Sequence, residues 1–339
     1  MQTSFTFTGT PETYIASHRP DVPMLIFNPA ALHQRFKLFQ TGFPGLVTYA
    51  LKANDTSEVI ENLHMAGLTT FDVASHAEIA RVRDLCPDAT LHYNNPVRSV
   101  CEIQIGVQAG VASWSVDCIS ELEKLIEHGA MGEIAVRLHL PMGGSAYNFG
   151  EKFGACPDDA VTLLQRVARA GYQAAMTFHV GTQCIDHTAW DHYISACHDI
   201  AQLAGVTLSR LNVGGGFPAH RHGVATDLAA IFIQIITSIE RTFGDQAPKL
   251  VCEPGRALVS ECYQLLVRVK GRKANNILYL NDGIYGAMVE WRDIGPVKRL
   301  NIMRPSGEHI TDQVDAFTVF GPTCDSLDRL PGTVALPQS

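Results

Sequence analysis

The sequence predicts an α/β protein: a (β/α)8 barrel joined to a second, smaller β domain. Two observations support this prediction. Short apolar segments alternate with helical patterns from residue 46 to residue 253, and after Glu253 the strand-like segments follow one another without helices of comparable length. A doubly wound open sheet is the alternative arrangement for the alternating part.

The alternating part has the number of elements that a barrel needs. Eight strands are expected at 46–50, 69–73, 90–93, 112–116, 134–138, 176–179, 210–213 and 250–253, and helices at 57–66, 76–84, 99–109, 120–128, 158–170, 188–203 and 227–243. Glycine follows six of these helices, at 67, 110, 129, 171, 205 and 244, as a left-handed C-cap requires. Ser75 with Glu78 and Ser120 with Glu123 have the spacing of capping boxes.

The β domain is expected to combine both ends of the chain. Strand-like segments at 263–270, 276–280 and 314–320 follow the barrel, and the segment before Asn28 has the same non-helical character. Pro20 and Pro23 suit a crossing point between the domains. We therefore expect a barrel over residues 24–260 and a β domain made of residues 1–23 and 261–339.

Composition excludes several functional classes. With 46% hydrophobic and 18% charged residues the chain resembles an ordinary globular protein, and a net charge of -8 argues against nucleic acid or an anionic membrane as a partner. The start has no basic segment followed by an apolar one, and no apolar run is long enough to span a bilayer. Nine scattered cysteines show no C-x-x-C pair or zinc-ligand spacing, so we expect reduced thiols, a cytoplasmic protein and no metal site.

Lys52 is the first candidate for chemistry. It follows an apolar strand without polar alternation, which predicts burial on both faces of the strand. Desolvation lowers the pKa of an ammonium group and makes the neutral amine available for a Schiff base with a carbonyl. The alternative is a structural lysine that ends a core strand and extends into solvent.

The carboxyl ends of the other expected strands also carry polar or glycine residues. In a (β/α)8 barrel these ends form the active-site face. The residues found there are Lys52, Asp72, Asn94, Asp117, Arg137, His179, Gly214, Gly215, Gly216, Glu253 and Arg256. Surface polarity without a function would not be distributed in this way.

Each of these residues also has a structural explanation. The glycine run could be a phosphate nest or a flexible turn. Glu253 and Arg256 could pair with each other, His179 could be a core histidine, and Asp72 could form an ion pair with Arg137 across the barrel mouth. A lysine, a phosphate nest, an arginine and a carboxylate at one mouth nevertheless describe a pyridoxal-phosphate site.

Six ordered motifs give a more specific indication. They are YALKAN at 49–54, FDVAS at 71–75, FHVGT at 178–182, GGGF at 214–217, EPGR at 253–256 and GPTCDSLD at 321–328. In this order they resemble the fold-type III pyridoxal-phosphate decarboxylases, the group that acts on ornithine, lysine, arginine and diaminopimelate, and are closest to ornithine decarboxylase. The resemblance implies an alanine-racemase-like barrel and a head-to-tail homodimer with shared active sites.

The resemblance also implies roles for the barrel residues. Lys52 would hold the cofactor as a Schiff base, Glu253 would bond the pyridine nitrogen, and His179 would lie against the ring. Asp72 and Arg137 would position the lysine and the ring hydroxyl side. The phosphate would be held by Thr182, Gly214, Gly215, Gly216, Gly255 and Arg256.

The same resemblance implies the substrate. Cys324 from the partner subunit would return a proton to the substrate, and Asp325 would meet the distal amine, with Tyr285 and Asp293 also binding substrate. Arg292, beside Asp293, bears on the preference for an amine over a carboxylate. The expected reaction is decarboxylation of L-ornithine to the polyamine putrescine, with L-lysine second and diaminopimelate as an alternative.

One feature departs from the family pattern. The family continues past the Cys-Asp motif with further strands and a Gly-Ala-Tyr segment, whereas this sequence ends at Ser339, so we expect an incomplete β domain. Two alternatives of other classes are a racemase on the same barrel and a non-catalytic regulatory homologue. Cys324 and Asp325 argue against the racemase, and the combination of Lys52, Glu253 and Arg256 with Cys324 argues against the homologue.

Overall fold

The computed structural model describes residues 9–141, 152–221, 226–310 and 313–338. The chain divides into two compact units. One comprises Pro29–His220 with Thr226–Cys262, and the other comprises Met1–Asn28, Arg221–Ala225 and Tyr263–Ser339. The first unit begins at Pro29 rather than at residue 24, because the strand before it pairs within the second unit.

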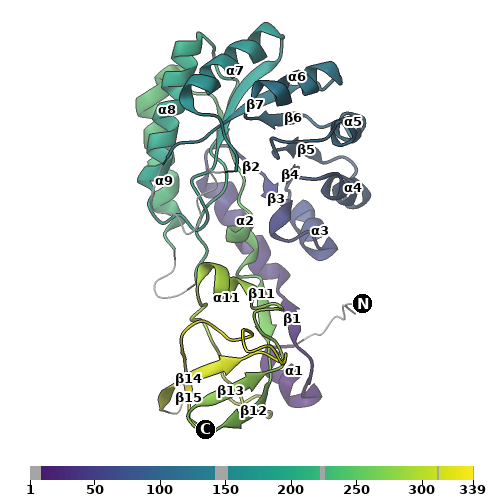
Figure 1. Cartoon of the computed structure of the whole chain (residues 1–339), viewed down its shortest axis with the longest axis vertical. Helices are drawn as coiled ribbons and strands as arrows, with labels where there is room; N and C mark the ends of the chain where they lie inside the picture. Colours follow the sequence, from purple (N-terminus) through teal and green to yellow (C-terminus); the bar gives the residue numbers. More distant parts are fainter. Residues whose placement is uncertain (1–8, 142–151, 222–225, 311–312, 339) are drawn as a thin grey trace. The chain divides into compact units, whose positions relative to one another are not determined.

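The first unit is built on one parallel sheet in the order β2-β10-β9-β8-β7-β6-β5-β4-β3 (Figure 1). The strands are β2 Leu46–Val47, β3 Tyr49–Ala50, β4 Thr70–Val73, β5 Thr90–Tyr93, β6 Ser113–Val116, β7 Glu133–Leu138, β8 Gln173–Phe178, β9 Arg210–Asn212 and β10 Lys249–Cys252. Its two edge strands, β2 and β3, are consecutive, and the Thr48 amide between them donates to Cys252 O at 2.9 Å. The sheet therefore nearly closes on itself, which confirms the barrel and excludes the open sheet.

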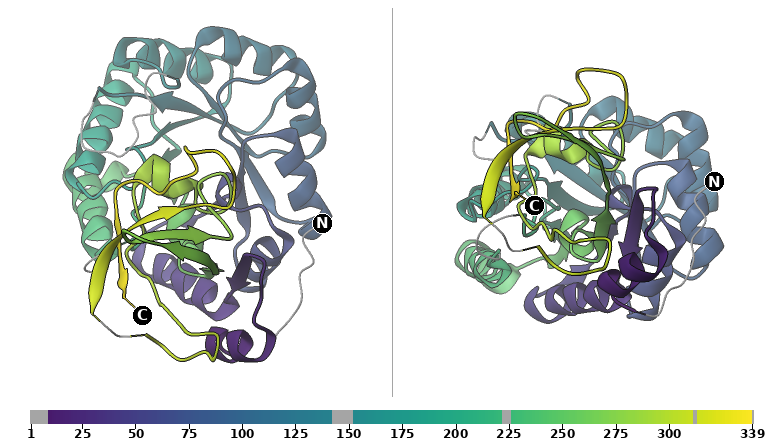
Figure 2. Two further views of the ribbon diagram at one scale, coloured as in Figure 1. Left: turned by 60° about the horizontal axis from the view of Figure 1, so that its bottom comes forward. Right: turned by 90° about the horizontal axis from the view of Figure 1, so that it is seen from below.

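Helices surround the strands of this unit (Figure 2). They are α2 Pro29–Gly42, α3 Ser57–Met65, α4 His76–Leu85, α5 Val100–Gln108, α6 Ile119–Glu127, α7 Pro157–Arg169, α8 Thr188–Ala204, α9 Leu228–Phe243 and the short α10 Arg256–Val259. Helix α2 was not predicted. Its buried Leu32, Phe36 and Phe39 have helical spacing, so the signal was present in the sequence.

Local chemistry explains where these helices begin and end. Helix α7 starts at Pro157, which needs no partner for an N–H, and carries acidic residues in its first turn and basic ones in its last, as the helix dipole favours. The six glycines expected at helix ends all have positive φ. These positions tolerate a left-handed backbone because glycine lacks a Cβ.

The predicted capping boxes were only partly right. Ser75 accepts a hydrogen bond from the Glu78 amide, but the Glu78 carboxylate accepts one from Ala74 N instead of closing the box. Ser120 lies inside α6, whose N-cap is Cys118, so that prediction is wrong. The spacing alone cannot distinguish a cap from a serine one turn further along.

The barrel interior contains a buried polar cluster at the amino ends of its strands. Glu133 accepts a hydrogen bond from Ser113 Oγ at 2.8 Å and pairs with Arg210 at 3.2 Å. The Arg210 guanidinium also lies 3.1 Å from His92 Nε2. Burial and the arginine lower the pKa of His92 to about 3, so this histidine is neutral inside the barrel.

The second unit is a β structure, and its described residues include two short helices. It contains α1 Pro11–His18, β1 Met24–Phe27, β11 Tyr263–Leu266, β12 Val269–Lys273, β13 Ile277–Leu280, α11 Val289–Ile294, β14 Val314–Phe320 and β15 Val334–Pro337. Strands β12 to β15 form one sheet, in which β13 and β14 are parallel, and β1 pairs with β11. Leu278, Leu280, Trp291 and Phe317 belong to its core.

Two predictions for this unit were wrong. The segment 263–270 is not one strand, because β11 pairs with β1 whereas β12 pairs with β13. The segment before Asn28 is not free of helix, because Thr10 caps α1 and Pro11 opens it, although residues 1–8 lie outside the described part.

In the described residues no helix is long and apolar enough to cross a membrane.

Candidate active site

Lys52 lies directly after the barrel strand β3. It belongs to a single 3-10 turn, η1 Leu51–Ala53, rather than to the strand itself. Its neighbour Leu51 is fully buried, whereas Lys52 is exposed in the single chain. The expectation of a buried lysine is therefore wrong for the single chain, because Lys52 lies in a turn after the strand and not in the strand itself.

Close backbone contacts bring the predicted motifs together around this turn. A Cβ on Gly255 would lie 2.9 Å from the Ala53 side chain, so the corner at 253–256 lies against the lysine turn. A Cβ on Gly215 would lie 2.8 Å from Glu253 O and 3.3 Å from His179 Nε2. The lysine turn, the histidine, the glycine run and the glutamate corner therefore occupy one region of the barrel.

The glycine run is a built turn rather than a loose one. Gly214 and Gly216 have φ values of 67° and 85°, which disfavour any residue with a Cβ. A Cβ on Gly214 would collide with Phe178 O, and one on Gly216 would collide with Gly181 O. Only glycine fits here, and backbone N–H groups in such a turn can cradle a phosphate.

Glu253 is the buried acceptor at the centre of the site. Its Oε1 accepts a hydrogen bond from Asn94 Nδ2 at 2.5 Å and another from Asn212 Nδ2. Sequence reasoning placed Asn94 at this mouth but missed Asn212. The signal for Asn212 was its position as the last residue of β9, two residues before the glycine run.

Asp72 is a second buried carboxyl group near Glu253. Burial and the charge of Glu253 raise the pKa of Asp72, and burial raises the pKa of Glu253. Asp72 Oδ1 and Asn94 Oδ1 are buried without a hydrogen-bond partner in the described structure. Two buried oxygens thus lack a partner, and one of them belongs to a carboxyl group that lies close to Glu253. This arrangement fits a site that is completed by a cationic or hydrogen-bonding group.

Arg137 and His179 provide the remaining predicted barrel groups. Burial lowers the pKa of Arg137, opposed by Glu253 and Asp117, and its guanidinium lies 5.2 Å from the Phe153 ring centre. In the described part of the chain Arg137 forms no ion pair with Asp72, so the structural pair considered for them is absent. Burial, with the charges of Lys52 and Arg137, lowers the pKa of His179, whose imidazole is neutral.

The predicted substrate residues lie in the second unit and form a group of their own. Tyr285 Oη donates to Asp325 Oδ2 at 2.7 Å, and both residues are exposed, as is Cys324. Arg292 Nε pairs with Asp293 Oδ1 at 2.7 Å. A hydrogen bond from the Leu327 amide and then the one from Tyr285 lower the pKa of Asp325.

A buried aspartate organises this group and was not singled out from the sequence. Asp328 is 1% exposed and accepts hydrogen bonds from Ile284 N, Thr323 N and Thr323 Oγ1. It thereby ties the loop that carries Cys324 and Asp325 to the loop that carries Tyr285. Its position four residues after Cys324 gave no sign of this burial.

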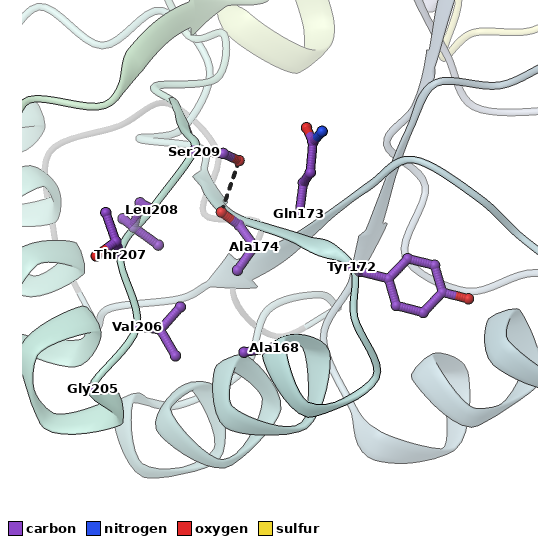
Figure 3. Close-up of a pocket in the computed structure, with 9 residues that line it drawn as sticks. All are labelled: Ala168, Tyr172, Gln173, Ala174, Gly205, Val206, Thr207, Leu208 and Ser209. Carbon is purple, nitrogen blue, oxygen red and sulfur yellow. Dashed lines mark hydrogen bonds between the residues drawn. The ribbon is translucent and has the colours of Figure 1, made fainter.

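A pocket away from these residues is an alternative location for a ligand. A pocket at the amino ends of β8 and β9 is bounded by Tyr172, Gln173 and the segment 205–209 (Figure 3). Ser209 Oγ in it donates to Ala174 O at 2.9 Å. Since this pocket contains none of the predicted site residues and lies at the opposite end of the strands, we do not regard it as catalytic.

In the described part of the chain no cluster of three or more His, Cys, Asp or Glu side chains could hold a metal.

Comparison with known proteins agrees with this geometry. Residues 30–260 match the family described as pyridoxal-dependent decarboxylase, pyridoxal binding domain. The chain belongs to this family. The decarboxylase is 29% identical to decarboxylase flvG of Aspergillus flavus, over 86% of this chain and 71% of that one. It is 29% identical to the lysine/ornithine decarboxylase of Selenomonas ruminantium, over 94% of this chain and 81% of that one.

Solved structures support the same assignment. The crystal structure of SrLDC in complex with PLP and cadaverine superposes on the decarboxylase with a TM-score of 0.82 and 26% identity, over 100% of this chain and 87% of that one. The family is that of basic amino-acid decarboxylases, and its cofactor is pyridoxal phosphate. The glycine turn and the orphaned acceptors at Asp72 and Asn94 fit that cofactor.

Proposed function

We propose that this enzyme decarboxylates L-ornithine to putrescine, with L-lysine as its second substrate. The observation that carries the proposal is the hydrogen bond from Tyr285 to Asp325, which holds an exposed carboxylate beside the Cys324 thiol. A fixed carboxylate selects a substrate with a distal ammonium group. The relative from Selenomonas ruminantium, named for both lysine and ornithine, supports the same substrate class.

The barrel residues would bind and orient the cofactor. Pyridoxal phosphate, when bound, takes up the electron pair released as carbon dioxide leaves the substrate. Lys52 is the amine that would hold it, and the buried Glu253 would accept a hydrogen bond from its ring nitrogen. The neutral His179 would pack on the ring without repelling a positive charge there.

A second set of barrel groups would hold the phosphate. The backbone amides of the glycine run and the side chains of Thr182 and Arg256 are its candidate ligands. Gly255 allows the close approach of the glutamate corner to the lysine turn, where a Cβ would lie 2.9 Å from Ala53. Asp72 and Arg137 would position the Lys52 side chain and the side of the cofactor ring that carries the hydroxyl group.

Completion of the reaction requires a proton at the substrate's α-carbon. We assign it to the Cys324 thiol, which loses the proton to that carbon after the carboxylate has left as carbon dioxide. In this proposal the thiol and Asp325 come from the partner subunit of a head-to-tail homodimer. Mixing a Lys52→Ala chain with a Cys324→Ala chain would then restore part of the activity, since a mixed dimer holds one intact site.

A substrate panel tests the proposal. Purified enzyme is incubated separately with L-ornithine, L-lysine, L-arginine and meso-diaminopimelate, and released carbon dioxide is measured. We expect the highest kcat/KM for L-ornithine and a visible absorbance band that Lys52→Ala abolishes. Release of carbon dioxide from meso-diaminopimelate alone would refute the proposed substrate, and a wild-type protein without the band would refute the role of Lys52.

A further inference from the structure

One oxygen of Glu253 receives two amide hydrogen bonds. Asn94 Nδ2 lies 2.5 Å from Oε1, and Asn212 Nδ2 donates to the same atom. The other oxygen, Oε2, takes neither amide. All three side chains lie in the barrel, and Asn212 and Glu253 are 5% and 9% exposed, so water does not replace these contacts easily.

The orientation of Asn212 is fixed by a third group. Its Oδ1 accepts a hydrogen bond from Gly214 N at 2.9 Å, so its Nδ2 must face the carboxylate. This amide therefore couples Glu253 to the first residue of the glycine turn. A side chain of the same size without an N–H could fill the space but could not make the contact.

Asn94 is held by its own loop. Ser115 Oγ donates to Asn94 O at 3.1 Å, and the buried Arg98 donates to Tyr93 O at 3.2 Å and to Asn95 O. These bonds anchor the backbone on both sides of Asn94. Its amide also interacts with Asp72 and lowers the pKa of that carboxyl against the effect of burial. The side chain thus lies between the two carboxyl groups of the site.

We propose that Asn94 and Asn212 are positioning residues that hold Glu253 ionised and turned so that Oε2 accepts the ring N–H of the cofactor. The inference rests on the proposed role of Glu253 and goes beyond it, because it names two hydrogen-bond donors that act together with Lys52, Arg137 and Asp72 to keep this acceptor charged. Burial favours the protonated carboxylic acid, which could not serve as an acceptor for the ring proton in the same way. Hydrogen bonds to the charged form oppose that effect.

The competing explanation is that the two amides only pack the barrel. Both explanations predict lower thermal stability when an amide is removed. Only the positioning role predicts a change in the protonation of the cofactor ring, because a packing defect elsewhere in the barrel leaves Glu253 ionised. The protonation state of the ring nitrogen is therefore the informative measurement.

The test uses holoenzyme loaded with pyridoxal phosphate labelled with 15N at the ring nitrogen. We compare wild type with Asn94→Leu and Asn212→Leu, which keep side-chain size and remove the donors. Asn95→Leu is the matched control, since Asn95 is in the same loop and its amide donates to Ala74 O instead. Glu253→Gln reports on the role of the glutamate itself.

We expect a protonated ring signal in wild type and in Asn95→Leu, and a displacement toward the neutral ring in both other asparagine variants. The cofactor Kd should rise about tenfold for each amide removed, which corresponds to about 1.4 kcal/mol, because Glu253 then binds the ring nitrogen less well. A wild-type signal in whichever of the two variants folds would overturn the inference while leaving the decarboxylase assignment intact. An unchanged ring signal in Glu253→Gln would instead remove the proposed role of Glu253.

Discussion

Tyr285 and Asp325 are joined by a hydrogen bond of 2.7 Å between the phenolic oxygen and one carboxylate oxygen, although they are forty residues apart in the sequence. The contact forms because Asp328 accepts hydrogen bonds from both of their loops, at Ile284 N and at Thr323 N. Tyr285 is 51% exposed, so this hydrogen bond lies at the surface of the single chain. It fixes one oxygen of Asp325 and leaves the carboxylate charged.

Removing the phenolic hydroxyl should weaken substrate binding. In Tyr285→Phe the Asp325 carboxylate loses one of the two hydrogen bonds that lower its pKa, so its pKa rises and its orientation is less restricted. We expect KM for L-ornithine to rise about threefold, because the exposed carboxylate is then less well oriented toward the substrate, with a smaller change in kcat. Steady-state kinetics measure both constants.

Tyr279→Phe is the control for this variant. The Tyr279 ring stacks on Phe320 at 5.6 Å between centroids in the same unit, and the substitution keeps that stack. Its KM should equal that of wild type. Equal KM values in the two variants would mean that the Tyr285 hydroxyl does not act on the substrate site.

His92 should make stability depend on acid. Its pKa is about 3 in the folded barrel against an ordinary value of 6.5, so between these values the unfolded chain binds a proton that the folded chain does not. The contribution of His92 is therefore complete above pH 6.5 and is lost as the pH falls toward 3, by about 1.4 kcal/mol per pH unit. Urea unfolding at a series of pH values between 4 and 8 measures it.

His92→Gln isolates this effect from the titration of carboxyl groups. The glutamine amide oxygen can still accept a hydrogen bond from Arg210, but the side chain does not bind a proton in this range. The free energy of unfolding should therefore fall less steeply with acid in the variant. Parallel curves for wild type and variant would show that the histidine is charged in the folded barrel or accessible to water.

Asp328→Asn should destabilise the second unit. The asparagine amide would place an N–H group where the carboxylate now accepts from Thr323 N and Thr323 Oγ1. Loss of a buried charged acceptor costs about 2 to 4 kcal/mol of unfolding free energy, and kcat should fall because the Cys324 loop loses its anchor. Asp315→Asn, in the same unit and only half-buried, should cost much less.

The barrel was predictable because its signals are local and repeated. Eight apolar segments, six glycines with positive φ and polar residues at strand ends each follow from sequence alone. The boundary between β11 and β12 was not predictable, because it depends on pairing with β1 at the other end of the chain. Local patterns cannot show which distant strand a segment will join.

The site residues also divide into those that a local pattern predicts and those that depend on distant parts of the chain. Lys52, Glu253 and the glycine run were found because each ends a strand, but the exposure of Lys52 depends on a turn that the apolar pattern conceals. Asn212 was missed since an asparagine before glycines is also typical of an ordinary turn. Its role becomes visible only when β9 and β10 are adjacent and Glu253 lies within reach.

Arg292 is the residue whose removal should change substrate preference. Its guanidinium pairs with Asp293 at 2.7 Å and lowers the pKa of that carboxyl, so the carboxylate is charged but already engaged. In Arg292→Gln we expect KM for L-ornithine and L-lysine to fall about threefold, because Asp293 is then available to a distal ammonium group and exposed ion pairs are individually weak. Parallel kinetics with both substrates measure the change.

The control is Arg268→Gln, which removes another exposed arginine that pairs with an aspartate, Asp21, in the same unit. It should leave both KM values unchanged, because its partner is not a predicted substrate residue. A rise in KM for L-ornithine and L-lysine in Arg292→Gln would contradict the prediction, since it would mean that the guanidinium itself attracts the substrate. A preference for a substrate with a distal carboxylate, lost in the same variant, would then follow from the charge of Arg292.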